Sequence, residues 1–121
     1  MDKLTVEQIA INLRARLERE CPPMYQCKTW STKLTGELKE AGYSAKLIRG
    51  TVNLGTQRSR NLSSDRYRYW DHYWVEVGGK IIDITSDQFK GDSKTFKCKK
   101  VKIVTIRSRD YVHKFHHECH W

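Results

Sequence analysis

The chain has 121 residues, the size of one domain, so residues 1–121 are expected to fold around a single core. Only 38 % of the residues are hydrophobic, but four Trp, six Tyr and three Phe offset this and argue against wholesale disorder. A formal net charge of +9 favours either acidic or nucleic-acid partners or a solvated basic surface. No apolar run approaches the roughly 18–20 residues of a membrane span, and no apolar signal segment is present. A cytoplasmic location is therefore expected, without a membrane partner.

Residues 5–20 are predicted to form an amphipathic helix of purely structural role. Thr5 and Gln8 have capping-box spacing, in which each side chain bonds a backbone amide near the helix start. Apolar side chains recur at helical intervals, at Val6, Ile9, Leu13 and Leu17. The side chains expected to face water are those of Arg14, Arg16, Glu18 and Arg19. The following Pro22 and Pro23 prevent the helix from continuing.

A second helix is predicted over residues 27–41, with Gly42 as its stop. Its apolar stripe consists of Cys27, Trp30, Leu34, Leu38 and Ala41. Residues 44–52 indicate a strand. Residues 53–71, which are rich in Arg, Ser and Asn, are predicted to be a surface loop or an insertion.

The clearest local signal is a β-hairpin formed by residues 73–77 and 80–85 around Gly78 and Gly79. Residues 101–106 indicate a further strand, whereas residues 113–121 give no clear pattern. Two helices followed by strands predict an α+β fold, with the N-terminal helices packed on an antiparallel sheet.

The hairpin register predicts a polar pair. If the two glycines form the turn, Val77 pairs with Lys80 and Trp74 lies opposite Asp83. His72 then shares a face with Asp83 as its diagonal neighbour, about 7–8 Å away at Cα and within side-chain reach. A carboxylate in this place orients an imidazole and stabilises its charged form.

Cys27 is the candidate nucleophile, because the amides at a helix start favour a thiolate. Packed against His72, it would complete a Cys–His–Asp set in which His72 is base and then acid and Asp83 orients the ring. The alternative from the same residues is an inert core cysteine beside an ordinary cross-strand polar pair.

Residues 27–50 and 72–89 resemble the two signatures of the transglutaminase-like superfamily, whose fold is a permuted papain-like one. The first signature is a Cys that opens a helix, followed by Leu core positions, a Gly stop and a strand with a small residue and a Gly. The second is His-x-Trp-x-Glu-Val followed by Asp-x-Thr, which here begins at His72 and ends at Thr85. The chain departs from the family in its short His-to-Asp connection and its small size.

The resemblance implies that Cys27 is the nucleophile, His72 the base and Asp83 the orienting group. It implies a cysteine-dependent acyl-transfer enzyme, such as a peptide or amide hydrolase, a deamidase or a transglutaminase, that needs no cofactor. The substrate would be a peptide or protein, and the basic charge is compatible with an acidic one.

Three further residues are candidates for substrate binding. Gln26 and Tyr25 precede the nucleophile and are considered for the second oxyanion-hole donor, beside the Cys27 backbone amide. Trp74 could shield the thiol–imidazole pair or line an acyl pocket, although its simpler interpretation is a core residue. Glu76, on the same face, is interpreted as a rim carboxylate. Asp87 and Gln88 are interpreted as turn residues, with Phe89 in the core.

Other functions are weighed against the enzyme. A basic nucleic-acid-binding module is suggested by interleaved cations and aromatics, namely Arg58, Arg60, Arg66, Arg68, Tyr67, Tyr69 and Trp70. A catalytically inactive transglutaminase-like interaction domain is the other alternative. The tail carries four His and Cys119, but without standard zinc spacing, so no metal site is expected. The four cysteines form no CxxC pair and are expected to be reduced.

Overall fold

A computed structural model of the chain describes residues 3–22, 26–53, 69–89 and 99–113. The elements in chain order are α1 (Val6–Leu17), α2 (Cys27–Glu40), β1 (Lys46–Asn53), β2 (Tyr69–Val77), β3 (Lys80–Asp83), the 3₁₀ helix η2 (Ser86–Phe89), β4 (Lys102–Thr105) and β5 (Tyr111–Val112). This confirms the predicted α+β class, in which two helices precede an antiparallel sheet. The loop predicted at residues 53–71 is wrong at both ends, where Asn53 belongs to β1 and residues 69–71 to β2, and residues 54–68 lie outside the described residues.

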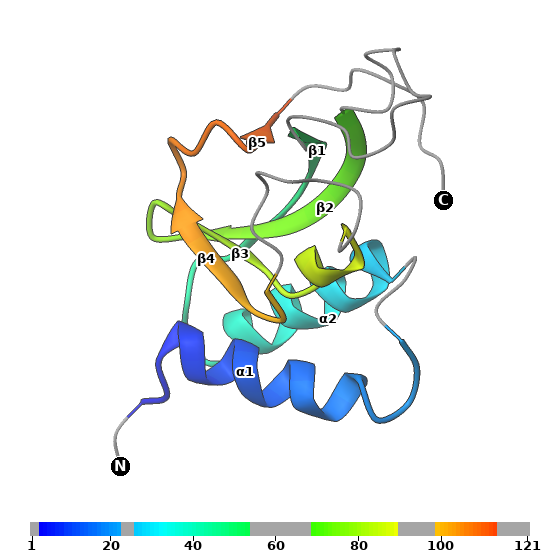
Figure 1. The fold of residues 1–121 in the computed structure, drawn as a ribbon. Helices are drawn as coiled ribbons and strands as arrows, with labels where there is room; N and C mark the ends of the chain where they lie inside the picture. The colour runs from blue at the N-terminus through cyan, green and yellow to red at the C-terminus, as the bar shows by residue number, and fades with distance from the viewer. Residues whose placement is uncertain (1–2, 23–25, 54–68, 90–98, 114–121) are drawn as a thin grey trace.

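The sheet has the strand order β4-β3-β2-β1-β5, and each neighbouring pair is antiparallel. Figure 1 shows the sheet curling above the two helices, with β2 as its longest strand. β1 pairs with β2 along its whole length, from Lys46 opposite Glu76 to Asn53 opposite Tyr69. The sequence does not predict β5, because two residues give no periodic pattern. β5 nevertheless extends the sheet beside Thr51 and Val52 of β1.

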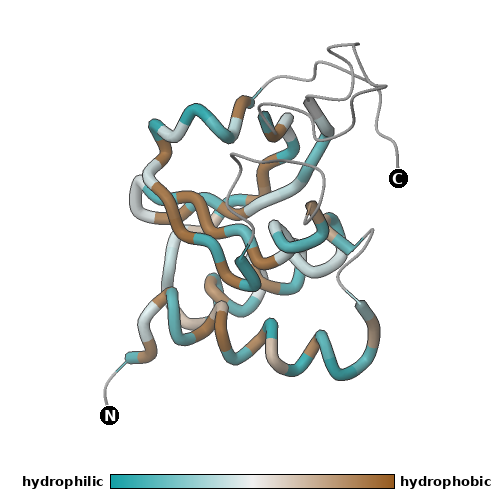
Figure 2. The backbone as a smooth tube through the Cα atoms, viewed as in Figure 1, coloured by the Kyte–Doolittle hydropathy of each residue, from teal (hydrophilic) through white to brown (hydrophobic). Residues whose placement is uncertain are grey.

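Both predicted helices are present. α1 begins after the N-cap Thr5, and the capping box with Gln8 is formed in both directions. α1 ends at Leu17, three residues before the predicted end, in a turn where the amides of Glu20 and Cys21 both bond the Leu17 carbonyl oxygen. α2 ends at Glu40, and Gly42 follows with a φ of 94°, which favours glycine. Figure 2 shows hydrophobic and hydrophilic residues alternating along α1, as expected for a helix with one buried face.

The sheet separates two apolar clusters. One lies between the sheet and the helices and includes Leu13, Leu34, Val75 and Ile82. The other consists of Val52, Trp74, Ile81, Phe89 and Tyr111. Since successive strand residues point to opposite faces, β2 supplies Val75 and Val77 to the first cluster and Trp74 to the second. The second cluster is the one that borders the predicted site.

Arg14 does not face water as predicted. Only 3 % of the residue is exposed, and its guanidinium forms two bonds to Asp87, at 2.8 and 2.7 Å, and one of 2.7 Å to the Ile84 carbonyl. It also lies over the Trp30 ring, 5.3 Å from the centroid. The buried charge is tolerated because the planar guanidinium donates hydrogen bonds to a carboxylate and to a carbonyl oxygen that lie along its N–H directions. This contact ties α1 to η2.

We predict that Arg14→Met destabilises the fold by about 3 kcal/mol or more, because it leaves the Asp87 carboxylate without its guanidinium in a largely buried place. The matched control is Arg16→Met, which removes an exposed pair with Glu37 and should cost less than about 1 kcal/mol. Urea unfolding of both variants measures the difference. Equal losses of unfolding free energy in the two variants would contradict the stabilising role of buried Arg14.

Gly50 is required by close packing. A Cβ atom there would lie 2.3 Å from the Val112 carbonyl oxygen and 2.4 Å from Cη2 of Trp74. We predict that Gly50→Ala lowers the free energy of unfolding by about 2–3 kcal/mol, since β5 or the indole must move. The control is Gly36→Ala in α2, where a Cβ meets nothing within 4 Å. That change should stabilise the protein by about 0.5–1 kcal/mol, because alanine is the better helix former. Urea unfolding curves of both variants test these two predictions. Similar changes in the free energy of unfolding would contradict them.

Candidate functional site

The Gly78–Gly79 turn sets the geometry of the candidate site. Both glycines have positive φ, 58° and 75°, as a tight two-residue hairpin requires. The turn fixes the predicted register, in which Val77 pairs with Lys80 and Val75 with Ile82. Continued by one step, this register sets Trp74 opposite Asp83 and makes His72 its diagonal neighbour.

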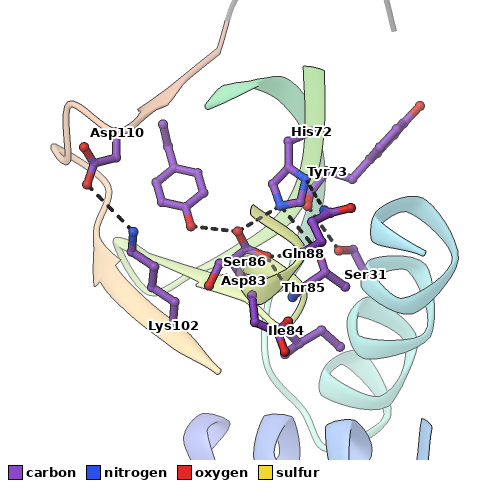
Figure 3. A network of polar contacts seen from close by, with 12 residues as sticks. Ser31, His72, Tyr73, Asp83, Ile84, Thr85, Ser86, Gln88, Lys102 and Asp110 are labelled. Carbon is purple, nitrogen blue, oxygen red and sulfur yellow. Dashed lines mark hydrogen bonds and ion pairs between the residues drawn. The ribbon is translucent and has the colours of Figure 1, made fainter. Parts of the chain in front are cut away.

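The predicted contact between His72 and Asp83 is formed. Nε2 of His72 lies 2.8 Å from Oδ2 of Asp83, and both side chains are completely buried (Figure 3). Because Nε2 faces the carboxylate, Nδ1 is the ring nitrogen left for another partner.

Cys27 also reaches this imidazole. It is the first residue of α2, and its side chain is one of the groups that raise the pKa of His72. The approach is possible because β3 pairs with β2 only from Val75 to Val77, whereas β1 continues past His72 with Gly50 opposite it. The flank of the ring beyond the end of β3 therefore has no strand beside it among the described residues. The three predicted residues thus lie in one region of the structure. Only 2 % of Cys27 is exposed.

Asp83 accepts hydrogen bonds at both oxygens. Oδ1 accepts from the Thr85 amide at 3.0 Å and from the Thr85 hydroxyl at 3.2 Å. Oδ2 accepts from His72 and, at 2.7 Å, from the Tyr111 hydroxyl. Burial alone raises the pKa of Asp83, but the charge of His72 and these hydrogen bonds outweigh it and lower the pKa below its usual value. The carboxylate is therefore held in its ionised form.

The pKa of His72 is shifted in the opposite direction from that of Asp83. Burial lowers its pKa, but the charge of Asp83, the hydrogen bond to Asp83 and the contact with Cys27 together raise the pKa to about 9. Asp83 and Cys27 therefore favour the charged form of the ring beside the ionised carboxylate. Phe89 meets the same ring edge-on, with centroids 5.0 Å apart, and excludes water from it.

We predict a pH dependence of stability from this pair. The pKa of His72 is about 9 when folded and about 6.5 when unfolded, so the stabilisation is fully present below pH 6.5. It is lost as the pH rises toward 9, because the folded state then gives up the proton that it held more tightly. Urea unfolding between pH 6 and 9 should show this decline in the parent protein and a flatter profile in His72→Gln. Parallel profiles would contradict the charged pair.

The other predicted residues lie as follows. Trp74 is completely buried beside His72 and Tyr111, with ring centroids 6.3 and 5.0 Å away, which confirms the core interpretation. Its proposed contact with substrate stays a prediction and would require the indole to be uncovered. Gln26 is half-buried at the N-cap of α2 and forms no side-chain cap. Tyr25 lies outside the described residues.

Glu76 and His113 form a contact near the edge of this region. The Glu76 carboxylate accepts a bond of 3.2 Å from Nε1 of Trp74 and is paired with Nε2 of His113. Glu76 is thus a partly covered rim carboxylate, as expected, and it is bonded to the core indole.

The sequence interpretation missed three supporting side chains. Asp87 and Gln88 belong to η2 rather than to a simple turn, and they bond Arg14 and His72. The buried position of Phe89 is confirmed. Tyr111 carried no signal, because its contact with Asp83 depends on the pairing of β5 with β1. Thr85 could be found, since it lies on the predicted face two residues after Asp83.

The competing sites fall largely outside this part of the chain. Among the described residues, no cluster of three or more His, Cys, Asp or Glu could hold a metal. Cys21 is half-buried with a free thiol, whereas Cys98, Cys119 and the histidines after His113 lie outside the described residues. The same holds for the arginines at 58, 60, 66 and 68. None of the described helices is long and apolar enough to cross a membrane.

A cavity of about 740 Å³ lies at the other end of the hairpin, beside the start of α1. Its lining includes Val6, Tyr43, Val77, Lys80 and Ile103, but not Cys27, His72 or Asp83. The candidate site is therefore a compact buried cluster that is separate from this cavity.

Comparisons with known protein families, with curated proteins and with solved structures gave no match.

Proposed function

We propose that the protein is a cysteine-dependent acyl-transfer enzyme with a transglutaminase-like fold. The observation that carries this proposal is that Cys27 and Asp83 both interact with the buried His72 imidazole. A thiol, an imidazole and an ionised carboxylate in that order form the arrangement that activates a sulfur nucleophile.

The surrounding fold supports the proposal. Cys27 is the first residue of a 14-residue helix, and the Gln26 side chain places no cap on the first-turn amides, whose partial positive charge stabilises an anion at such a position. His72 and Asp83 lie on adjacent antiparallel strands packed against that helix, as the resemblance to transglutaminase-like proteins implies.

The chemistry follows from these positions. The Cys27 thiolate attacks the carbonyl carbon of a peptide or side-chain amide, and His72 holds the thiol proton as an imidazolium. As the carbon–nitrogen bond breaks, His72 gives that proton to the departing amine and a thioester on Cys27 remains. His72 then takes a proton from water or from an acceptor amine, whose oxygen or nitrogen attacks the thioester. The carbon–sulfur bond breaks and the proton returns to the sulfur.

Hydrolysis, deamidation and cross-linking share this thioester and differ only in the amide consumed and the acceptor that resolves it. The acyl donor would be a peptide or protein, and the net charge of +9 favours an acidic one. Because Cys27 is buried, productive binding requires the side chains above the sulfur to separate.

The test is covalent labelling of Cys27 by iodoacetamide, a small reagent, followed by peptide mass spectrometry. At pH 7 we expect His72→Ala to slow labelling by about 100-fold, since it removes the base, and Asp83→Ala to slow it less. The control is His113→Ala, which removes an exposed histidine and should label like the parent protein. Acylation of Cys27 by a library of peptide amides, trapped with hydroxylamine, then tests turnover. Equal labelling of Cys27 in the parent and in His72→Ala would refute the proposal.

A further inference from the structure

A second polar group competes for the catalytic nitrogen. Nε2 of Gln88 lies 3.2 Å from Nδ1 of His72, and the Gln88 residue is only 4 % exposed (Figure 3). With Nε2 of the ring facing Asp83, Nδ1 is the ring nitrogen that remains to take a proton from Cys27. An imidazole nitrogen has either one lone pair or one N–H, so a strong bond to the amide weakens the bond to the sulfur.

The amide is held firmly in this place. Its neighbour Asp87 forms the two bonds to Arg14 that fix η2 to α1. On the other side, Phe89 is buried against the His72 ring. Ser86, at the start of η2, accepts from the Lys99 amide at 3.0 Å and donates to the Lys99 carbonyl at 2.6 Å. Three separate contacts therefore position the short helix that carries Gln88.

The direction of the Gln88 bond decides its effect. When the amide nitrogen faces Nδ1, it donates to the ring lone pair, which exists only while Nδ1 carries no proton. This bond stabilises the neutral imidazole. Transfer of the Cys27 proton to Nδ1 would bring two N–H groups against each other, unless the amide turned over.

We propose that Gln88 is a positioning residue that donates to Nδ1 of His72 and thereby restrains proton transfer from Cys27 in the resting protein. The inference rests on the proposed function, because it concerns regulation of the same site. Gln88 opposes the groups that favour the charged ring. Those groups are Asp83 from β3, Cys27 from α2 and, through the carboxylate, Tyr111 from β5. β1 places Gly50 opposite His72, and the charge of Asp87 is paired with Arg14.

This restraint affects how well His72 can act as a general base. A general base works best when its pKa is near the working pH, and a buried carboxylate alone would leave the ring too basic to release its proton. A donor at Nδ1 moves the imidazole back toward the neutral form.

The experiment measures the ring directly. Nitrogen-15 NMR of the imidazole follows the His72 titration, with His72→Gln identifying its signals among the five histidines. Gln88→Met keeps the volume but removes the donor. The pKa of His72 should then rise by about 0.4–1 unit above its parent value, and Cys27 should react with iodoacetamide up to about tenfold faster at pH 6–7.

Two further variants make the result decisive. Gln88→Asn keeps an amide but withdraws it by one methylene, so it should raise the pKa in the same direction even if Gln88→Met fails to fold. Asn12→Ala removes an exposed amide from α1 and should leave the titration unchanged. An unchanged or lowered pKa of His72 in the folded Gln88 variants would overturn the inference.

The two proposals fail in different ways. If Cys27 labelling is independent of His72, the proposed function fails. If labelling depends on His72 but Gln88 variants leave both the titration and the labelling rate unchanged, only the role of Gln88 fails.

Discussion

The buried pair of His72 and Asp83 is the interaction on which the rest of this structure depends. Both side chains are completely removed from water, and such a pair is tolerated only if the remaining polar atoms are also bonded. Thr85 and Tyr111 meet this need at the carboxylate, and Gln88 and Cys27 meet it at the ring. Side chains from α2, β2, β3, η2 and β5 therefore meet at one ionic contact.

The site lies where the two sides of the sheet come together. α2 packs on the face that carries Val75, whereas His72 belongs to the face that carries Trp74. The end of β3 at Asp83 removes the strand that would otherwise separate them. The short strand therefore matters to the candidate site, because no strand lies between the start of α2 and this flank of His72 among the described residues.

The local pattern of the sequence was sufficient for the two helices, the hairpin and the predicted contact of His72 with Asp83. A glycine pair fixes the register, and the register fixes which side chains share a face. Arg14 and Tyr111 could not be predicted in this way, since their burial depends on partners 70 and 28 residues away, which leave no local trace. The contact of Gln88 with His72 was missed for a different reason. A polar residue that follows a strand more often belongs to a turn than forms a hydrogen bond to a buried imidazole.

The placement of Tyr111 on β5 has a consequence for the order in which the protein matures. During synthesis the hairpin and both helices leave the ribosome before residue 111, so the nascent domain holds Asp83 without its phenol. The strand that delivers this group has only two paired residues and bonds to β1, which is distant in the chain. The thiol centre is therefore completed late, and the newly made chain passes through its early folding with the carboxylate only partly satisfied.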